Sequence, residues 1–218
     1  GIHPVGQILE DEPDRLLEVW ILKSNRPGAA RRRVRSLAES NRLRFRLVDD
    51  RQLRGAVGDV VHQGVAARVS EFSYADFDAM LAVPGPGMIV ALDEVQDPHN
   101  LGAVIRTACG LGARGVLIPK HRSASVTATV RKVAAGAAAR LPVARETNLS
   151  AALAQAKDAG YWVYGAVIGA GLPLPEAALA ERSVLVLGSE RRGLRSLVAT
   201  HCDAQVTIPM GELESLNV

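Results

Sequence analysis

The sequence predicts an α/β protein made of two parts, a small first part and a larger second part with a mostly parallel sheet. Two observations support this prediction. After residue 86, continuously apolar runs alternate with helical patterns, which is typical of parallel strands covered on both faces. Before that point the elements are shorter, and PGPG at 84–87 is a break that no regular element would cross. We therefore expect a domain at 1–71, a linker at 72–86 and a second domain at 87–218.

The first part is expected to hold three strands and one helix. The helix is predicted at 28–41, because four apolar residues recur at helical spacing on one face: Ala30, Val34, Leu37 and Ala38. The strands are predicted from short runs rich in β-forming residues, at 18–22, 44–48 and 64–69. The second of these, RFRLV, alternates basic and apolar residues, as a half-buried strand does.

The second part repeats a strand–helix rhythm. Strands are predicted at 88–92, 115–119, 141–145, 162–167, 184–188 and 205–209. Helices are predicted between most of them, at 101–112, 125–139, 149–159 and 194–201. Ligands of such sheets bind at the carboxyl ends of the strands, so the loops that follow strands are where chemistry is expected.

The composition excludes several classes of protein. Hydrophobic residues make up 48% of the 218 residues, enough for a sizeable core, and no apolar run approaches the roughly 20 residues that span a bilayer. We therefore expect no membrane association. The two cysteines, Cys109 and Cys202, form no CxxC pair, and the histidines form no ligand cluster. These patterns predict a cytoplasmic protein without a metal site.

Positive charge is concentrated in one stretch of the first part. Residues 23–54 include eleven basic and three acidic residues, a net charge of +8, whereas the whole chain carries +3. This concentration predicts a surface for an anionic polymer, with nucleic acid as the first candidate. The alternative is an ordinary solvated helix face. The arginines expected to contact phosphates are Arg31, Arg32, Arg33, Arg35 and Arg44.

The first candidate loop is DPHNLGAVIRTA, residues 97–108. A helix that starts at Leu101 would bury four apolar residues, Leu101, Val104, Ile105 and Ala108. Arg106 would then project about 140° away from Leu101. Beside it the small Gly102 and Ala103 would leave room for a phosphate-bearing ligand. Asn100 would cap the helix or contact the ligand. From spacing alone, an N-cap and a surface arginine explain the pattern equally well.

The second candidate loop is LGSERRGL, residues 187–194, which also follows a strand. Gly188 would allow a ligand to approach the backbone closely, and Glu190 comes two residues later. A loop bounded by glycines is common in α/β proteins, so this signal is weak by itself.

The third candidate loop is IPMGELESLNV, residues 208–218, with Ser215 and Asn217 near its end. Other glycine-rich segments do not match a nucleotide-binding motif. GAVIGAGL, residues 165–172, has the wrong spacing for a dinucleotide site, and we expect a plain loop there.

Taken in order, the three loops resemble the three motifs of the SpoU/TrmH class of RNA ribose 2′-O-methyltransferases, in the SPOUT superfamily. VHQGVAARV at 61–69 and IPKHRSASVTATVRKVAAGAA at 118–138 are similar to the members that methylate a guanosine in the peptidyl-transferase P loop of 23S rRNA. The resemblance covers essentially the whole chain. It implies 2′-O-methylation of that guanosine ribose with S-adenosylmethionine as the cofactor.

The resemblance also implies an architecture. The first part would be a small α/β RNA-binding domain of the kink-turn-binding ribosomal-protein type, and the second a SPOUT domain with a deep trefoil knot. The active site of the class is completed across a homodimer. A C-terminal helix that completes the knot would follow Val218, so residues 1–218 are expected to lack part of the cofactor pocket and of the dimer surface.

Individual site residues follow from the matching motifs. By the resemblance, S-adenosylmethionine would bind against Gly188, Ile208, Met210 and Leu216. Asn100 and Glu190 would shape the active site, Ser215 and Asn217 would line it, and Arg106 would be the principal catalytic residue.

Because a guanidinium only donates hydrogen bonds, we expect Arg106 to hold a phosphate and stabilise the developing alkoxide. Proton abstraction by a perturbed arginine is the competing interpretation. Two other functions also stay open, a tRNA ribose 2′-O-methyltransferase of the same class and a non-catalytic RNA-binding assembly factor.

Overall fold

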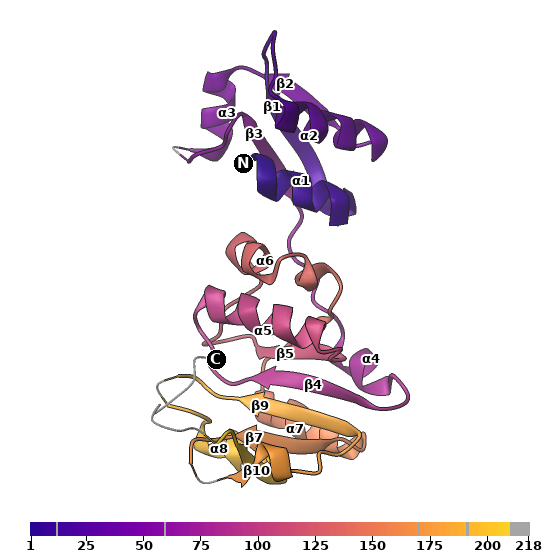
Figure 1. Ribbon diagram of the computed structural model, residues 1–218, viewed down its shortest axis with the longest axis vertical. Coiled ribbons are helices and arrows are strands. Elements are labelled where there is room, and N and C mark those ends of the chain that lie inside the picture. Colours follow the sequence, from indigo (N-terminus) through magenta and orange to yellow (C-terminus); the bar gives the residue numbers. More distant parts are fainter. Residues whose placement is uncertain (12, 59, 170, 191, 210–218) are drawn as a thin grey trace. The chain divides into compact units, whose positions relative to one another are not determined.

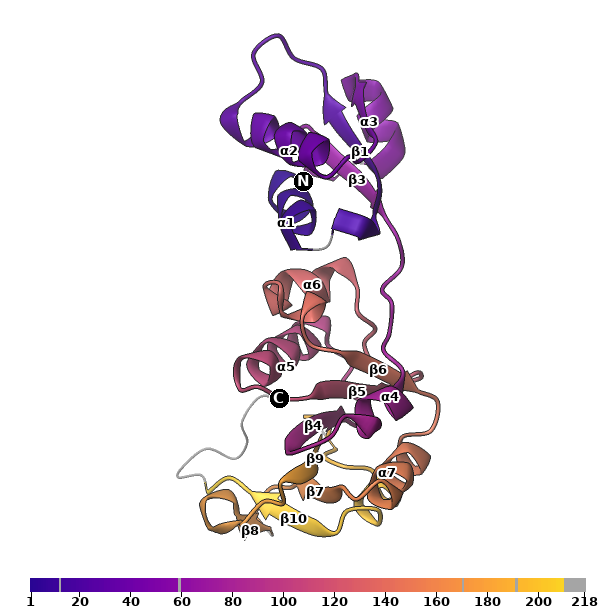
Figure 2. The same ribbon diagram turned by 90° about the vertical axis from the view of Figure 1, so that its right-hand side faces the viewer.

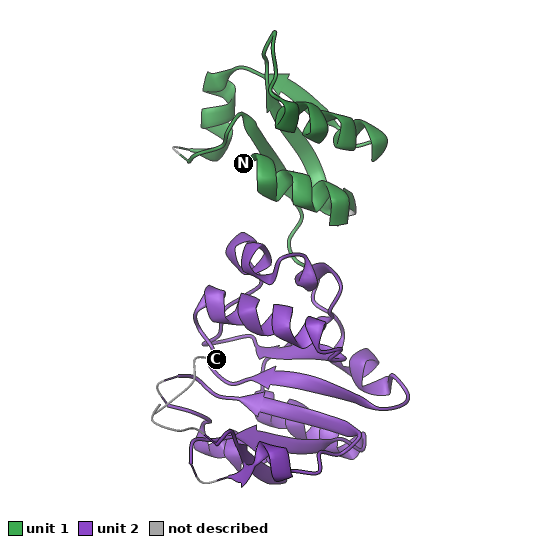
Figure 3. Cartoon of the chain, viewed as in Figure 1, with its two compact units in different colours: residues 1–72 green, residues 73–218 purple. Residues whose placement is uncertain are grey.

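The computed structural model describes residues 1–11, 13–58, 60–169, 171–190 and 192–209. The chain forms two compact units, Gly1–Phe72 and Ser73–Val218, which are coloured separately in Figure 3. No helix within the described ranges is both long and apolar enough to cross a membrane.

Unit 1 is a three-stranded sheet with helices on both faces (Figure 1). Its elements are α1 (Ile2–Asp11), a 3-10 turn η1 (Pro13–Arg15), β1 (Leu16–Leu22), α2 (Ala29–Ser40), β2 (Phe45–Val48), α3 (Asp50–Val57) and β3 (Val65–Val69). The central strand β1 is parallel to β2 and antiparallel to β3. The three expected strands and the helix α2 are confirmed, with ends shifted by at most two residues.

The two faces of this sheet carry separate cores. One core joins α1 and α2 to the sheet, and its buried residues are Val5, Leu9, Leu16, Val19, Ile21, Val34, Ala38 and Val65. The other core joins α3 to the opposite face through Leu53, Val48 and Ala66. The expectation that Ala30 belongs to the buried face of α2 is wrong, because Ala30 is exposed and only Val34 and Ala38 are fully buried in that helix.

Two helices of unit 1 were not expected from periodicity. α1 contains Pro4 and Gly6, which weaken the helical pattern. α3 is only eight residues long, but the sequence does carry a start signal. Asp49 accepts a hydrogen bond from the backbone of Gln52, whose side chain accepts one from the backbone of Asp49, which is a capping box.

Unit 2 contains a seven-stranded sheet in the order β6-β5-β4-β9-β7-β10-β8, and every neighbouring pair is parallel. Its strands are β4 (Gly87–Leu92), β5 (Gly115–Pro119), β6 (Val143–Glu146), β7 (Trp162–Ala166), β8 (Leu172–Pro173), β9 (Arg182–Leu187) and β10 (Ala204–Thr207). Its helices are α4 (Phe77–Ala82), α5 (Pro98–Gly110), α6 (Ala128–Ala134), α7 (Leu149–Asp158) and α8 (Ser196–Ala199), with 3-10 turns η2 (Ala137–Ala139) and η3 (Leu174–Glu176). The predicted parallel α/β fold is confirmed.

Helices cover both faces of this sheet, as continuously apolar strands require. α4, α7 and α8 share one core with the sheet, whereas α5 and α6 pack against each other on the other side (Figure 2). In β4, Ile89 and Ala91 point into the first core, and Val90 and Leu92 are buried as well.

The segment expected to be a linker contributes to unit 2. In α4, Phe77, Met80 and Leu81 are buried in the same core as α7. Arg114 holds the PGPG segment by donating to the carbonyl oxygens of Val83, Pro84, Gly85 and Pro86. Packing of this short apolar helix places residues 73–86 with the second unit.

Several expected boundaries in unit 2 need correction. The stretch 125–139 is not one helix, because Ala135 and Gly136 adopt left-handed backbone conformations that separate α6 from η2. The helix expected at 194–201 is reduced to the four residues of α8. The helix expected from Leu101 begins at Pro98, one turn earlier.

Candidate active site

Three loops of unit 2 leave the same edge of the sheet. β4 lies between β5 and β9, with Leu92 opposite Leu187 in the parallel register of β4 and β9. The segments after β4, β5 and β9 therefore emerge side by side, at 93–97, 120–127 and 188–194. This is the edge at which ligands of open α/β sheets bind.

The start of α5 places Asn100 inside the helix rather than at its cap. Asp97 is the N-cap, and its side chain accepts a 2.8 Å hydrogen bond from the backbone of His99. Pro98 occupies the first helical position, where its missing N–H costs nothing. The expected capping role of Asn100 is therefore wrong, and its amide is available to a partner outside the helix.

That partner is the loop after β9. Asn100 is buried, with 6% of its surface exposed, and its Nδ2 donates a hydrogen bond to Oε1 of Glu190. The first two candidate loops of the sequence are thus joined directly. A buried amide bonded to a charged carboxylate fixes the positions of both loops more strongly than a neutral pair would.

The loop after β9 is a tight turn that closes on itself. Ser189 and Gly193 exchange two backbone hydrogen bonds of 3.1 and 2.8 Å. A Cβ atom on Gly188 would lie 2.2 Å from the carbonyl carbon of Gly193. Gly188 is therefore required by the turn itself, whereas we expected it to be required by an approaching ligand.

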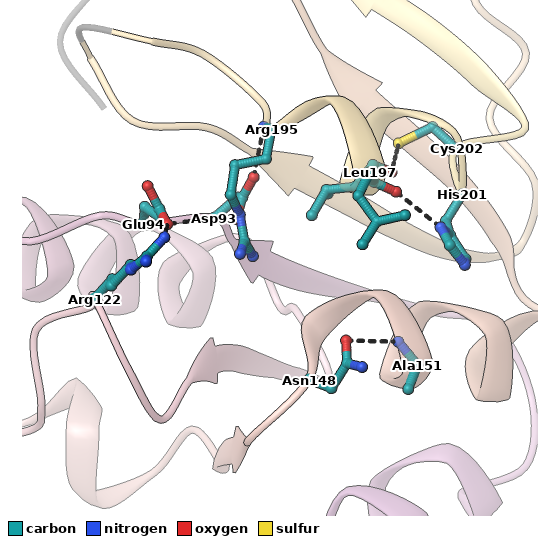
Figure 4. A network of polar contacts seen from close by, with 10 residues as sticks. Asp93, Glu94, Arg122, Asn148, Ala151, Arg195, Leu197, His201 and Cys202 are labelled. Carbon is teal, nitrogen blue, oxygen red and sulfur yellow. Dashed lines mark hydrogen bonds and ion pairs between the residues drawn. The ribbon is translucent and has the colours of Figure 1, made fainter.

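A buried carboxylate anchors the other end of this turn. Asp93 directly follows β4, is fully buried, and accepts hydrogen bonds from the backbone N and from Nε of Arg195, at 2.8 and 2.7 Å. Glu94 lies 3.7 Å from the same guanidinium and 3.4 Å from that of Arg122 (Figure 4). Sequence reasoning missed these residues, although the two carboxylates immediately after a buried strand were a visible signal.

A pocket of about 560 Å³ opens between these loops. The described residues that line it are Glu94, Val95, Gln96, Asp97, Arg122, Ser189, Glu190 and Arg192. It combines three carboxylates with two guanidinium groups, so it suits a ligand that carries both hydrogen-bond donors and negative charge.

Arg106 lies on the exposed side of α5. The four residues expected to form the buried stripe, Leu101, Val104, Ile105 and Ala108, are all buried, which confirms the predicted orientation of the helix. Gly102 does not clear a space for a ligand, because a Cβ atom there would lie 2.7 Å from Cβ of Val133 and 2.8 Å from the backbone oxygen of Val130. Its small size instead allows α6 to pack closely against α5.

Some of the expected site residues lie outside the described residues. These are Met210 and Leu216, expected to bind the cofactor, and Ser215 and Asn217, expected to line the active site. Gly188 is placed as above, and Ile208 follows β10 with 53% of its surface exposed.

The glycine-rich segment after β7, for which the sequence predicts a plain loop, lies between Gly188 and Ile208. β7 separates β9 from β10 in the sheet, so residues 167–169 leave the same edge as Gly188 and Ile208. The segment is held by hydrogen bonds from Val167 N to the backbone oxygen of Val206 and from Gly169 N to Oγ1 of Thr207, at 2.9 and 3.3 Å. The order of the strands, which motif spacing cannot supply, identifies it as a candidate part of the site.

The arginines of unit 1 differ in what they contact. Arg33 forms a 2.6 Å ion pair with Glu10, and Arg35 forms a 2.9 Å pair with Glu39. The other three arginines expected to contact phosphates have different surroundings: Arg32 donates to the backbone oxygen of Pro27, Arg31 packs against Gly64, and Arg44 is exposed.

Within the described part of the chain, no group of three or more histidine, cysteine, aspartate or glutamate side chains could hold a metal ion.

Comparisons with known proteins place both units in families. The model of the SpoU rRNA Methylase family matches residues 87–218, and the model of the RNA 2′-O ribose methyltransferase substrate-binding family matches residues 1–75. The chain is 41% identical over its whole length to the 23S rRNA (guanosine-2′-O-)-methyltransferase RlmB of Xanthomonas axonopodis pv. citri, covering 89% of that protein. It is 39% identical to RlmB of Pectobacterium atrosepticum, covering 91% of it.

Solved structures show the same fold. A TrmH-family protein from Porphyromonas gingivalis aligns over the whole chain and 82% of its own length, with a TM-score of 0.78 and 29% identity. The SpoU methyltransferase AviRb of Streptomyces viridochromogenes, solved in complex with AdoMet, aligns over the same shares with a TM-score of 0.77 and 23% identity. The chain belongs to the SpoU rRNA methylase family and is an RNA methyltransferase.

Proposed function

We propose that this chain transfers a methyl group from S-adenosylmethionine to the 2′-hydroxyl of a guanosine in 23S rRNA, in the cytoplasm and as a homodimer. The observation that carries the proposal is the hydrogen bond from Asn100 to Glu190, which joins the first two motif loops at the edge of a pocket. The two RlmB relatives that match this chain over its whole length carry this activity in their names.

The described residues fit S-adenosylmethionine at the carboxyl ends of β7, β9 and β10. Ile168 and Ile208 follow two parallel neighbouring strands, and they expose 63% and 53% of their surface. Apolar side chains at such an edge suit the face of an adenine ring, and polar groups on neighbouring loops fix its orientation. Gly188 would hold the turn beside them, and we infer from the motif that Met210 and Leu216 complete the cofactor site.

The bound cofactor supplies a methyl group on a sulfonium, which is already a good leaving partner. The chain therefore has to align the ribose and make its 2′-oxygen more nucleophilic. Arg106 would hold a phosphate of the target nucleotide and stabilise the alkoxide that develops, because a guanidinium donates to both in a fixed planar fork. Ser215 and Asn217 would line the ribose.

The carboxylates of the pocket already have partners. Glu190 accepts from Asn100, Asp97 accepts from the backbone of His99, and Glu94 pairs with Arg122 and Arg195. In this mechanism the proton of the 2′-hydroxyl passes to a phosphate oxygen or to water. Arg106 stabilises the negative charge that develops on the 2′-oxygen.

Unit 1 would hold the rRNA through its basic stretch. Arg31, Arg32, Arg33, Arg35 and Arg44 are the proposed contacts. No described residue forms a hydrogen bond or ion pair with the side chain of Arg44, so this guanidinium could direct its full charge at a phosphate. Such contacts supply affinity that depends on salt and not on base sequence.

Mass spectrometry of rRNA and tRNA from a strain that lacks the gene tests this function. We expect one 2′-O-methylguanosine to disappear from 23S rRNA and to return with the wild-type gene. Loss of a methylated ribose from tRNA would instead identify a tRNA methyltransferase of the same class. If no modification changes and the full-length protein fails to bind S-adenosylmethionine in calorimetry, the chain is a non-catalytic RNA-binding factor.

The oligomeric state needs a separate measurement. Sedimentation of the full-length protein at several concentrations should give the mass of a homodimer, and a monomer would contradict that part of the proposal.

A further inference from the structure

The pocket presents a charge problem for its proposed substrate. RNA carries one negative charge per nucleotide, yet three carboxylates line the pocket: Glu94, Asp97 and Glu190. Among the described lining residues the positive charges belong to Arg122 and Arg192. Among the described lining residues, these two guanidinium groups are therefore the candidates to hold a phosphodiester that enters this pocket.

Arg122 is presented by a loop whose backbone is fixed. Arg122 follows β5 and has a φ of 56°, in the left-handed region that non-glycine residues rarely occupy. The next two residues hold this conformation by donating to the backbone oxygen of Val95, from Oγ of Ser123 at 3.2 Å and from N of Ala124 at 2.9 Å. Strained residues held by their surroundings cluster at functional sites.

The partner of Arg122 is held in the same unusual way. Glu94 has a φ of 59°, and only 12% of its side chain is exposed. It is pinned next to Arg195, whose guanidinium is already committed to Asp93 at 2.7 Å (Figure 4). The position of Glu94 is therefore set without Arg122.

The pair between Arg122 and Glu94 is weak and easily exchanged. The two groups are 3.4 Å apart, whereas the pair between Arg195 and Asp93 is 2.7 Å long. The side chain of Arg122 is 74% exposed, so solvent screens the attraction. A phosphate, which accepts two hydrogen bonds from one guanidinium, would compete well for this group.

We propose that Arg122 is a substrate-positioning residue. Its guanidinium exchanges its partner Glu94 for a phosphodiester of the target RNA at the mouth of the pocket. Glu94 holds the guanidinium in place until the RNA arrives. This inference rests on the proposed function, and it adds a contact from the loop after β5 to those of the loops after β4 and β9.

The test compares three substitutions in the full-length protein, with 23S rRNA as the substrate. Arg122→Gln removes the charge and should raise KM for RNA roughly tenfold, the loss of one hydrogen-bonded charge contact. The slope of log affinity against log salt should fall by about 0.7–0.9. The kcat and the affinity for S-adenosylmethionine should change little. Arg122→Lys should keep the salt slope, with an intermediate KM, because an ammonium keeps the charge without the planar fork.

The direction in which Glu94→Gln changes KM for RNA decides between two roles of the pair. If Glu94 competes with the phosphate, its neutralisation should lower KM for RNA. If the pair only supports the fold, Glu94→Gln and Arg122→Gln should impair the protein alike. As a matched control, Arg140→Gln changes an exposed arginine that precedes β6, at the opposite edge of the sheet, and should leave the salt slope unchanged.

Two results would overturn the proposal for Arg122. One is a wild-type salt slope and KM in Arg122→Gln, and the other is a rise in KM in Glu94→Gln. Both are read against a wild-type protein that methylates 23S rRNA. If the wild-type protein transfers no methyl group to that RNA, it is the proposed function that fails.

Discussion

The side-chain amide of Asn100 donates a hydrogen bond to the carboxylate of Glu190, ninety residues further along the chain. The two residues come from the first turn of α5 and from the turn after β9. A double-mutant cycle with Asn100→Ala and Glu190→Ala should therefore give a coupling of about 1 kcal/mol in the free energy of unfolding. Urea denaturation measures it. Strictly additive effects would show that the contact does not stabilise the site.

Substitution of Arg106 should separate catalysis from stability. The side chain is exposed, so Arg106→Ala should change the free energy of unfolding by no more than about 0.5 kcal/mol. Methyl transfer should fall by about 10²–10³, because a donor that stabilises the developing charge is lost. Arg106→Lys should rescue poorly. Thr107→Ala, at the next exposed position, is the control, and near-normal turnover in Arg106→Ala would refute the proposed role.

Gly188→Ala tests whether the turn after β9 depends on this glycine for its own fold. The new Cβ would meet the backbone of Gly193 at 2.2 Å, so the turn has to move, at a cost of about 1–3 kcal/mol in stability. Cofactor binding should be lost with it. Gly110→Ala adds a methyl group with no atom within 4 Å and should leave both unchanged. If Gly188→Ala lost cofactor binding at full stability, a ligand rather than Gly193 would occupy that space.

Arginines of unit 1 should contribute unequally to RNA binding. Arg44→Ala should reduce the salt slope of 23S rRNA binding by about 0.7–0.9, because this exposed side chain can give its full charge to a phosphate. Arg33→Ala should reduce it less, since Glu10 lies 2.6 Å from that guanidinium. Filter binding at several salt concentrations measures both slopes. Equal slopes for both variants and the wild type would return this stretch to an ordinary solvated surface.

The thiol of Cys202 should be unreactive at ordinary pH. Burial, and then the nearby Asp203, raise the pKa of Cys202 from 9.0 to about 11, while Lys157 opposes this shift. Since the thiolate is the reactive form, its fraction at pH 8 falls about a hundredfold, and the alkylation rate should climb only as pH rises toward 11. Mass spectrometry after iodoacetamide treatment measures the alkylation rate of Cys202 in the native and in the unfolded protein. Rapid alkylation of the native protein at pH 8 would contradict the raised pKa of this thiol.

Most of the fold could be predicted because the signals are local. The buried stripe of α5 and the strands β4, β5 and β9 follow from the spacing of apolar residues, which depends only on helix and strand geometry. The helices α3 and α4 were missed because each is at most eight residues long, too short for a clear period.

The sequence by itself determined the α/β class, the basic stretch of unit 1, and the three motif loops with Asn100, Arg106 and Glu190. The tertiary structure decided what these residues contact. It moved the cap of α5 from Asn100 to Asp97 and gave Gly188 a role inside its own turn. It also brought Arg122 to the pocket. Such contacts depend on the order of strands in the sheet, and this order is fixed by packing between segments far apart in the chain.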